Sequence, residues 1–268
     1  MVVTGAGDSP AADLRPGPGP SSARRAVVWH DLECGGYRVD LPAWLELAER
    51  AGGPVLDVGA GTGRVSLALA RAGHRVTAVD RDQALLDALA QRATGMEIET
   101  VCADARALDL HARDYALCVM PMQTIQLLGG ADGRVSFLSG AREHVRPGGL
   151  IACAILGDVE PFDCSGGTVG PTPERLSVDG FDYVSRAIRV GRSRRTVSIE
   201  RERRIVGGPG AERRNCDAYV ERDVVELDRV SVAMLRRDAR AAGLRAGPVV
   251  TVEATDEHVG SSVVVMRV

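Results

Sequence analysis

The sequence predicts an α/β fold in which a doubly wound, mostly parallel sheet lies between helices. From residue 41 to residue 156, short apolar runs alternate with amphipathic segments, as expected where strands and helices follow in turn. Several of the apolar runs end in an acidic residue or a glycine-rich turn, which is typical of the carboxyl edge of such a sheet. These two observations set the fold class.

Each element has its own signal. Residues 41–51 have apolar positions at helical spacing and stop at Gly52, Gly53 and Pro54. The predicted strands of the first part are residues 55–58, 74–80, 98–101, 115–120 and 151–156. A helix over residues 230–242 and a hairpin of residues 245–252 and 259–268 complete the fold.

Two regions depart from this alternation. Residues 1–25 are rich in Gly, Pro, Ala and Ser and are expected to form a disordered leader to a folded domain of residues 26–268. Residues 170–229 contain extended segments with period-two alternation, which predicts an antiparallel β insertion. We expect this insertion to lie over the ligand crevice or to form the interface of a homodimer.

The most informative motif follows the first strand, where Gly59, Gly61 and Gly63 alternate before an amphipathic helix. A glycine-rich turn between strand and helix lets a ligand approach the backbone, and the helix presents free N–H groups. This arrangement suits a nucleotide-like cofactor.

Local charge separates two cofactor classes. A dinucleotide fingerprint needs a small third residue, but Arg64 stands there, and Asp57 would repel a pyrophosphate. S-adenosylmethionine has a sulfonium, an ammonium and no phosphate, so Asp57 favours it. Asp80 ends the next strand, 21 residues after Gly59 (80 − 59), where an acid accepts the ribose hydroxyls. Asp104 follows the third strand, within reach of the adenine amino group.

The segments LDVGAGTGR, VDRD, CADAR and VRPGGL stand in this order between residues 55 and 156. With these four segments in this order, the chain resembles the class I S-adenosylmethionine-dependent methyltransferases. The resemblance implies a Rossmann-like, seven-stranded sheet with a reversed final strand. The cofactor contacts that it implies are Asp57, Gly59, Ala60, Gly61, Asp80, Arg81, Asp104 and Ala105.

In the family, the segment after the fourth strand faces the methyl group. DNA and protein-amide N-methyltransferases carry an Asn/Asp-Pro-Pro-aromatic motif there, whereas this chain has Met120, Pro121, Met122 and Gln123, which argues against both of those acceptors. We expect Met120 to contact the cofactor. Gln123 is expected to contact cofactor or substrate, or to cap the following helix. Tyr37 is interpreted as a lid over the methionine portion, or else as an ordinary core or surface tyrosine.

Five histidines are candidates for a general base. His258 precedes the last strand and is the first candidate, the alternative being a loop histidine with an ordinary hydrogen bond. His30 lies in a stretch that covers the cofactor, and His144 is expected to be structural. The histidine and carboxylate spacing predicts no metal site.

Composition narrows the function classes. The net charge of −3 does not indicate a nucleic-acid partner, and all 33 basic residues are Arg. Six cysteines without a C-x-x-C pair predict a reduced, cytoplasmic protein, and the sequence predicts neither a membrane span nor a signal peptide.

Eight arginines lie between residues 186 and 204. They form an anion-binding face or, as we favour, the solvated face of edge strands.

The sequence therefore predicts an S-adenosylmethionine-dependent methyltransferase with a small-molecule acceptor, methylated on oxygen, nitrogen or carbon. One alternative is an NAD(P)-dependent oxidoreductase, which Asp57 and Arg64 disfavour. The other is a catalytically inactive subunit that binds S-adenosylmethionine.

Overall fold

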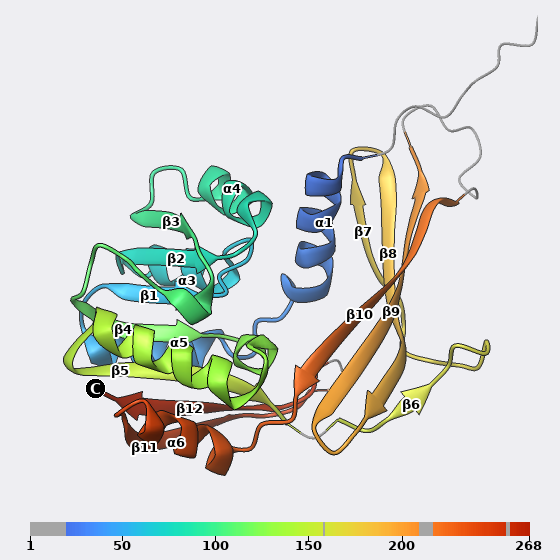
Figure 1. Ribbon diagram of the computed structural model, residues 1–268. Coiled ribbons are helices and arrows are strands. Elements are labelled where there is room, and N and C mark those ends of the chain that lie inside the picture. Colours follow the sequence, from blue (N-terminus) through green and yellow to red (C-terminus); the bar gives the residue numbers. More distant parts are fainter. Residues whose placement is uncertain (1–19, 158, 209–216, 256–257) are drawn as a thin grey trace, which may run out of the picture.

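The computed structural model describes residues 20–157, 159–208, 217–255 and 258–268, which form two sheets with helices around them (Figure 1). The predicted leader lies outside the described residues up to residue 19. None of the helices in the described ranges is long and apolar enough to cross a membrane.

The central sheet has seven strands in the order β11-β12-β5-β4-β1-β2-β3. Its strands are β1 (Val55–Val58), β2 (Val76–Asp80), β3 (Ile98–Cys102), β4 (Tyr115–Met120), β5 (Val145–Leu156), β11 (Arg245–Val252) and β12 (Ser261–Arg267). Strands β1 to β5 pair in parallel, and β12 runs antiparallel to both β5 and β11. The predicted doubly wound sheet with a reversed final strand is confirmed.

Apolar helix faces cover both sides of this sheet. The helices are α2 (Leu41–Ala51), α3 (Arg64–Arg71), α4 (Gln83–Arg92), α5 (Gly130–His144) and α6 (Val232–Ala241), with short 3-10 turns η1 (Ala105–Ala107) and η2 (Thr124–Leu127). Phe137 of α5 and Leu235 of α6 pack in one core cluster, and Trp44 of α2 and Leu69 of α3 pack in another. All of these side chains are buried, as the amphipathic spacing requires.

The predicted insertion is a second, antiparallel sheet with the order β10-β9-β8-β6 and β7 paired to β8. Its strands are β6 (Phe162–Asp163), β7 (Glu174–Val178), β8 (Phe181–Arg192), β9 (Thr196–Gly207) and β10 (Asp217–Asp228). In Figure 1 the long strands β8, β9 and β10 stand beside the central sheet.

Helix α1 (Ser22–Cys34) lies between the two sheets in Figure 1 and begins earlier than the sequence predicted. The expected leader extended to residue 25, but Ser21 caps the helix by accepting a hydrogen bond from the N–H of Arg24 at 3.2 Å. Trp29 packs edge-on against Tyr183 of β8, with ring centroids 5.0 Å apart. Tertiary packing therefore orders residues whose local composition resembles a linker.

Strand β5 also begins earlier than predicted, at Val145 instead of residue 151. Gly148 has a φ of 79° and the pairing with β4 shifts register between Tyr115 and Leu117. The segment still pairs with the chain end, because the N–H of Gly148 donates to the carbonyl of Val268 at 3.2 Å. The Pro-Gly-Gly sequence thus forms an irregular start to the strand, ahead of the predicted residues 151–156.

A buried ion pair connects α5 to α6 and to the end of β10, where the chain passes from the second sheet back to the central one. Arg134 of α5 donates from Nε to Asp238 of α6 at 2.8 Å, and from a terminal nitrogen to Asp228 at the end of β10 at 3.1 Å. The side chains of Arg134 and Asp238 are 3% and 4% exposed. Their mutual pairing satisfies charges that burial would otherwise penalise.

We expect Arg134→Met to lower the free energy of unfolding by about 3–5 kcal/mol, because it removes the closer, hydrogen-bonded cation from the buried carboxylate of Asp238 and leaves Arg237 at 3.7 Å, while keeping the aliphatic stem. Urea denaturation measures the change. The control is Arg113→Met, whose half-exposed side chain pairs with Asp109 and Glu143, and for which we expect a change of about 1 kcal/mol or less. Equal effects of the two substitutions would contradict the structural role given to the Arg134 pair.

Candidate cofactor and substrate cavity

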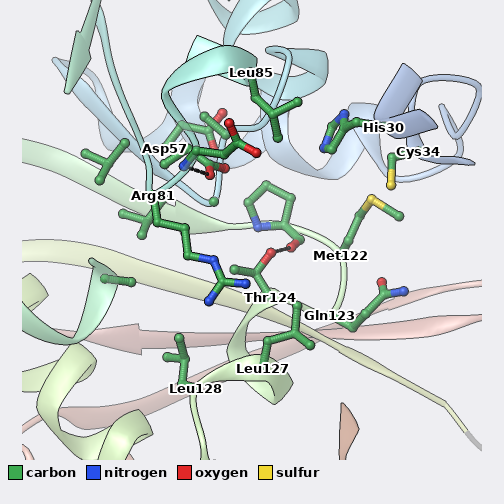
Figure 2. A pocket seen from close by; sticks show the side chains of 18 of the residues that line it. His30, Cys34, Asp57, Arg81, Leu85, Met122, Gln123, Thr124, Leu127 and Leu128 are labelled. Atoms are coloured by element: carbon green, nitrogen blue, oxygen red, sulfur yellow. Dashed lines mark hydrogen bonds between the residues drawn. The ribbon is translucent and has the colours of Figure 1, made fainter. Parts of the chain in front are cut away.

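A cavity of about 450 Å³ lies at the carboxyl edge of the central sheet, between the ends of β1, β2 and β4, helix α1 and the second sheet. Its volume falls in the range of small-molecule sites. The predicted cofactor residues that line it are Asp57, Gly59, Ala60, Asp80, Arg81, Asp104, Ala105 and Gln123. Figure 2 shows part of this wall.

The glycine-rich turn is shaped by side chains that pack onto it. Gly59 and Gly61 have φ values of 77° and 54°, which favour glycine. A Cβ at Gly59 would lie 2.9 Å from Oγ1 of Thr124, and a Cβ at Gly61 would overlap the imidazole of His30. Both of these neighbours line the cavity. The turn therefore needs glycine to bring Thr124 and His30 to the ligand space.

Asp57 is fully buried at the end of β1, yet only one of its carboxylate oxygens has a hydrogen bond. Ser66 donates to Oδ2 at 2.6 Å, while Oδ1 has no partner. Burial raises the pKa of Asp57 to about 6, although the Ser66 hydroxyl and the charge of Arg64 oppose the rise. An unpaired carboxylate oxygen in a cavity wall is a site for a cationic hydrogen-bond donor.

Asp80 ends β2 with its carboxylate held by backbone donors. The N–H of Gly61 donates to Oδ2 at 2.8 Å and the N–H of Asp82 donates to Oδ1 at 3.0 Å. The side chain therefore joins the β2 end to the glycine-rich turn and remains on the cavity wall. A carboxylate has further lone pairs, so it can also accept the hydroxyls of a ribose.

Asp104 follows β3 and is engaged differently. Its carboxylate pairs with Arg106 at 2.6 Å, and this pairing lowers the pKa of Asp104 to about 2. Because both side chains are more than 40% exposed, the pair is readily rearranged. A ligand amino group at this position would share Asp104 with Arg106.

Arg64, which argued against a dinucleotide site, forms a buried ion pair. Its NH2 donates to Oδ2 of Asp40 at 2.9 Å, its NH1 donates to the carbonyl of Tyr37 at 2.8 Å, and its side chain is 7% exposed. Asp40 also accepts from the indole N–H of Trp44 at 2.8 Å. Arg64 therefore fixes the start of α3 to the connection between α1 and α2.

Four predicted residues do not line the cavity, and the first of them is Gly61, which His30 covers. Tyr37 and His258 pack edge-on with ring centroids 5.0 Å apart, and burial raises the pKa of Tyr37. The backbone N–H of His258 donates to Oγ1 of Thr255 at 3.0 Å. Met120 is fully buried in the core. The proposed roles of Tyr37 as a lid and His258 as a base stay predictions, and neither residue is on the cavity wall.

Gln123 and Met122 stand at the mouth of the cavity, after β4 (Figure 2). Gln123 makes no capping hydrogen bond to η2, so its alternative role as a helix cap is not seen. Met122 has a φ of 53°, a left-handed conformation that is uncommon for a residue with a side chain. Such backbone strain is typical of functional sites.

The outer wall of the cavity was not predicted residue by residue. Helix α1 contributes His30, Glu33 and Cys34, and the second sheet contributes Ile199, Arg201, Val225 and Leu227. Burial raises the pKa of Cys34 to about 11, so its thiol is not ionised near neutral pH. The insertion thus covers the crevice, which is one of the two positions expected for it.

Arginines of the second sheet pair with carboxylates of the same sheet and of helix α1. Arg203 pairs with Glu33 at 2.7 Å and with Asp223 at 3.1 Å, and Arg201 pairs with Glu174 at 3.0 Å. These contacts support the interpretation of the arginine-rich strands as structural. Among the described residues, no group of three or more His, Cys, Asp or Glu side chains is arranged to hold a metal ion.

The pKa of Asp57 leads to a stability prediction. The rise from 3.8 to about 6 means that the folded state binds the proton more tightly than the unfolded state. This stabilisation is complete below pH 3.8 and is lost as the pH rises through 6, by about 3 kcal/mol in total. We expect Asp57→Asn, which has no charge, to gain stability relative to the parent protein by about that amount between pH 4 and pH 7.

Urea denaturation of both proteins across this pH range measures the gap. Ser66→Ala is the matched variant, because it removes the one hydrogen bond to the carboxylate and should widen the pH effect. A gap between Asp57→Asn and the parent protein that does not change with pH would contradict the raised pKa.

Comparison with known proteins agrees with this geometry. Residues 55–149 match the family model of a methyltransferase domain. A cypemycin N-terminal methyltransferase of Streptomyces sp is 35% identical over 130 residues, which are 47% of this chain and 51% of the relative. The chain thus spans about half the length of this curated relative.

Solved structures match over nearly the whole chain, at an identity that shows the fold alone. A sugar N-methyltransferase of Streptoalloteichus sp has a TM-score of 0.67 at 16% identity, covering 100% of this chain and 99% of its own. An amino pentose methyltransferase of Micromonospora echinaspora, solved with S-adenosylmethionine bound, has a TM-score of 0.66 at 20% identity, covering 90% and 97%. Residues 55–149 thus match a methyltransferase domain, and the chain has the same fold as solved S-adenosylmethionine-dependent methyltransferases.

Proposed function

We propose that this protein transfers the methyl group of S-adenosylmethionine to a small-molecule acceptor. The observation that carries the proposal is that Asp57 lines the cavity and that its buried Oδ1 has no hydrogen-bond partner. Asp80 and Asp104 follow at the ends of the next two strands. A cofactor with a cationic amino-acid portion and an adenosyl portion matches this set of acids, because it offers hydrogen-bond donors to each.

The cavity supports a division of tasks among its residues. Asp57 would hold the amino-acid portion of the cofactor, Asp80 the ribose, and Asp104 the adenine amino group. When bound, S-adenosylmethionine supplies a methyl carbon already activated by its sulfonium. The protein therefore has to orient an acceptor in line with that carbon and to exclude water, which is a matter of positioning.

The outer wall is suited to a small acceptor with an apolar body. Ile199, Val225 and Leu227 contribute apolar surface from the second sheet, and Leu127 contributes it from η2. Arg201 adds a cationic group on the same side. The cavity volume of about 450 Å³ favours a small molecule over a nucleic acid or a folded protein as acceptor.

We further propose a nitrogen atom of an amine as the acceptor. The relatives named for their acceptors include an N-terminal methyltransferase, a sugar N-methyltransferase and a glycopeptide N-methyltransferase. Methylation of a free amine needs little help from a general base. This is consistent with the position of His258 away from the cavity wall.

We expect Asp80→Ala to weaken the binding of S-adenosylhomocysteine by about 1–3 kcal/mol, because it removes a charged hydrogen-bond acceptor. Isothermal titration calorimetry with the purified protein measures the affinity. The control variant is Asp109→Ala, whose carboxylate is 90% exposed and does not line the cavity.

A parallel titration with NAD(H) tests the oxidoreductase alternative. Binding of S-adenosylhomocysteine alone supports the proposal, whereas binding of NAD(H) alone would overturn it. Turnover of S-adenosylmethionine with any member of an amine panel then separates an active enzyme from an inactive cofactor-binding subunit.

A further inference from the structure

His30 is the histidine that the structure places on the cavity wall, and its hydrogen bonds determine its tautomer. Nδ1 of His30 lies 3.1 Å from Oγ1 of Thr62, and that hydroxyl donates to Oδ1 of Asp31 at 2.7 Å. Because a threonine hydroxyl has one proton, Oγ1 can only accept from Nδ1. The proton of a neutral His30 is therefore on Nδ1, and Nε2 has the free lone pair.

Asp31 is itself fixed, which keeps this arrangement in place. Two nitrogens of Arg92 on α4 donate to its two carboxylate oxygens, at 2.9 and 2.6 Å. Burial raises the pKa of Asp31, but the bonds from Arg92 and Thr62 outweigh it and lower that pKa, so that Asp31 accepts and does not donate. The chain of contacts from Arg92 through Asp31 and Thr62 orients the imidazole ring of His30.

The free nitrogen lies over the turn that follows β1. A Cβ at Gly61 would overlap Nε2 and Cε1 of His30, so Nε2 lies directly over this glycine. In Figure 2 the ring lies beside Cys34 and across the cavity from Arg81. Asp80 ends β2 and Asp104 follows β3, and in the proposed function these two acids hold the nucleoside part of the cofactor. In the same proposal Asp57 of β1 holds the amino-acid part, so that the turn after β1 lies next to that part.

The charges around His30 favour its neutral form. Burial lowers the pKa of His30, with Arg64 adding to the effect and the carboxylates of Asp31, Asp80 and Glu33 opposing it. Each of these carboxylates has closer partners of its own, namely Arg92, the backbone N–H groups of Gly61 and Asp82, and Arg203 with Ser185. A neutral imidazole accepts a hydrogen bond from a cationic ligand without repelling its charge.

We propose that His30 contacts the cofactor directly, with Nε2 accepting a hydrogen bond from the ammonium group of S-adenosylmethionine. Asp31 and Thr62 act as positioning residues that present this nitrogen. The inference rests on the proposed function, since it assumes that S-adenosylmethionine is the ligand. It assigns a cofactor role to a histidine for which the sequence alone indicated only a covering position.

Two amide variants of His30 distinguish the roles of its two ring nitrogens. His30→Asn places an amide near the Nδ1 position and leaves nothing at Nε2, whereas His30→Gln reaches the Nε2 position with an amide oxygen that accepts. Calorimetric titration at pH 8 with S-adenosylhomocysteine, which retains the ammonium, is the measurement. We expect roughly tenfold weaker binding for His30→Asn and a change of about threefold or less for His30→Gln.

A truncated ligand locates the contact within the cofactor. 5′-Methylthioadenosine has the nucleoside and the sulfur but lacks the amino-acid portion, so its affinity should be the same in the parent protein and in His30→Asn. A second pair, Thr62→Val and Thr62→Ser, tests the positioning role, with weaker binding of S-adenosylhomocysteine expected only for valine. This pair also keeps the proposal testable if His30→Asn fails to fold, which thermal melting reveals.

The outcomes are distinguishable. If the parent protein binds neither S-adenosylhomocysteine nor S-adenosylmethionine, the proposed function itself is wrong. If the parent protein binds and folded His30→Asn binds equally well, the role of His30 is wrong. An equal loss of affinity for 5′-methylthioadenosine would overturn the contact with the ammonium group and assign His30 to the nucleoside.

Discussion

The arrangement of the site depends on the pairing of helix α1 with both halves of the molecule. On one side, Asp31 pairs with Arg92 of α4 at 2.6 Å. On the other side, Glu33 pairs with Arg203 of β9 at 2.7 Å and accepts from Ser185 of β8 at 2.7 Å. Two carboxylates within one turn of a helix thus connect the central domain to the second sheet (Figure 1).

Packing strengthens the second of these connections. Trp29 contacts Tyr183, and the guanidinium of Arg203 lies 5.6 Å from the indole ring centroid. The indole N–H of Trp29 is buried without a partner, which is a cost that the apolar and cation–π contacts must offset. The pairing of Glu33 with Arg203 is only 11% and 16% exposed, so loss of either partner would leave a charge in a poorly hydrated position. These contacts therefore fix helix α1 in the position where it forms part of the outer wall of the cavity.

The sequence predicted the central sheet well because its signals are local. Residues 115–120 form a strand with the predicted limits, since a continuous apolar run specifies it, and residues 245–252 also have the predicted limits. The acids at the strand ends were also predicted, because each directly follows or ends an apolar run. Parallel topology then brings these strand ends to one edge of the sheet. The start of α1 was missed, because Ser22 and its neighbours are polar and are ordered by contacts with residues more than 150 positions away.

The outer wall of the cavity was harder to predict, since its residues are brought together only when the two sheets are docked. Nothing local to Ile199 or Leu227 indicates that it faces a ligand, because alternation predicts which residues share a face but not what that face covers. The same limit applies to Tyr37 and His258, which the fold does bring together, 5.0 Å apart, but next to Arg64 and off the cavity wall. Tertiary placement, which periodicity does not encode, decides these positions.

Asp57 shows why the site is less stable without its ligand than its packing would allow. A second donor to Oδ1 from the protein would satisfy the carboxylate in the free state, but it would also compete with the ammonium of the cofactor that we propose for this site. With only Ser66 as a hydrogen-bond partner, the negative charge of the buried carboxylate is poorly stabilised, and its pKa is raised for that reason. A cationic donor would stabilise the same charge. A ligand that supplies the missing donor binds the folded state alone and thereby stabilises it. In the proposed function, the energetic cost of the unpaired carboxylate and the preference of the site for a cationic cofactor thus have the same physical origin.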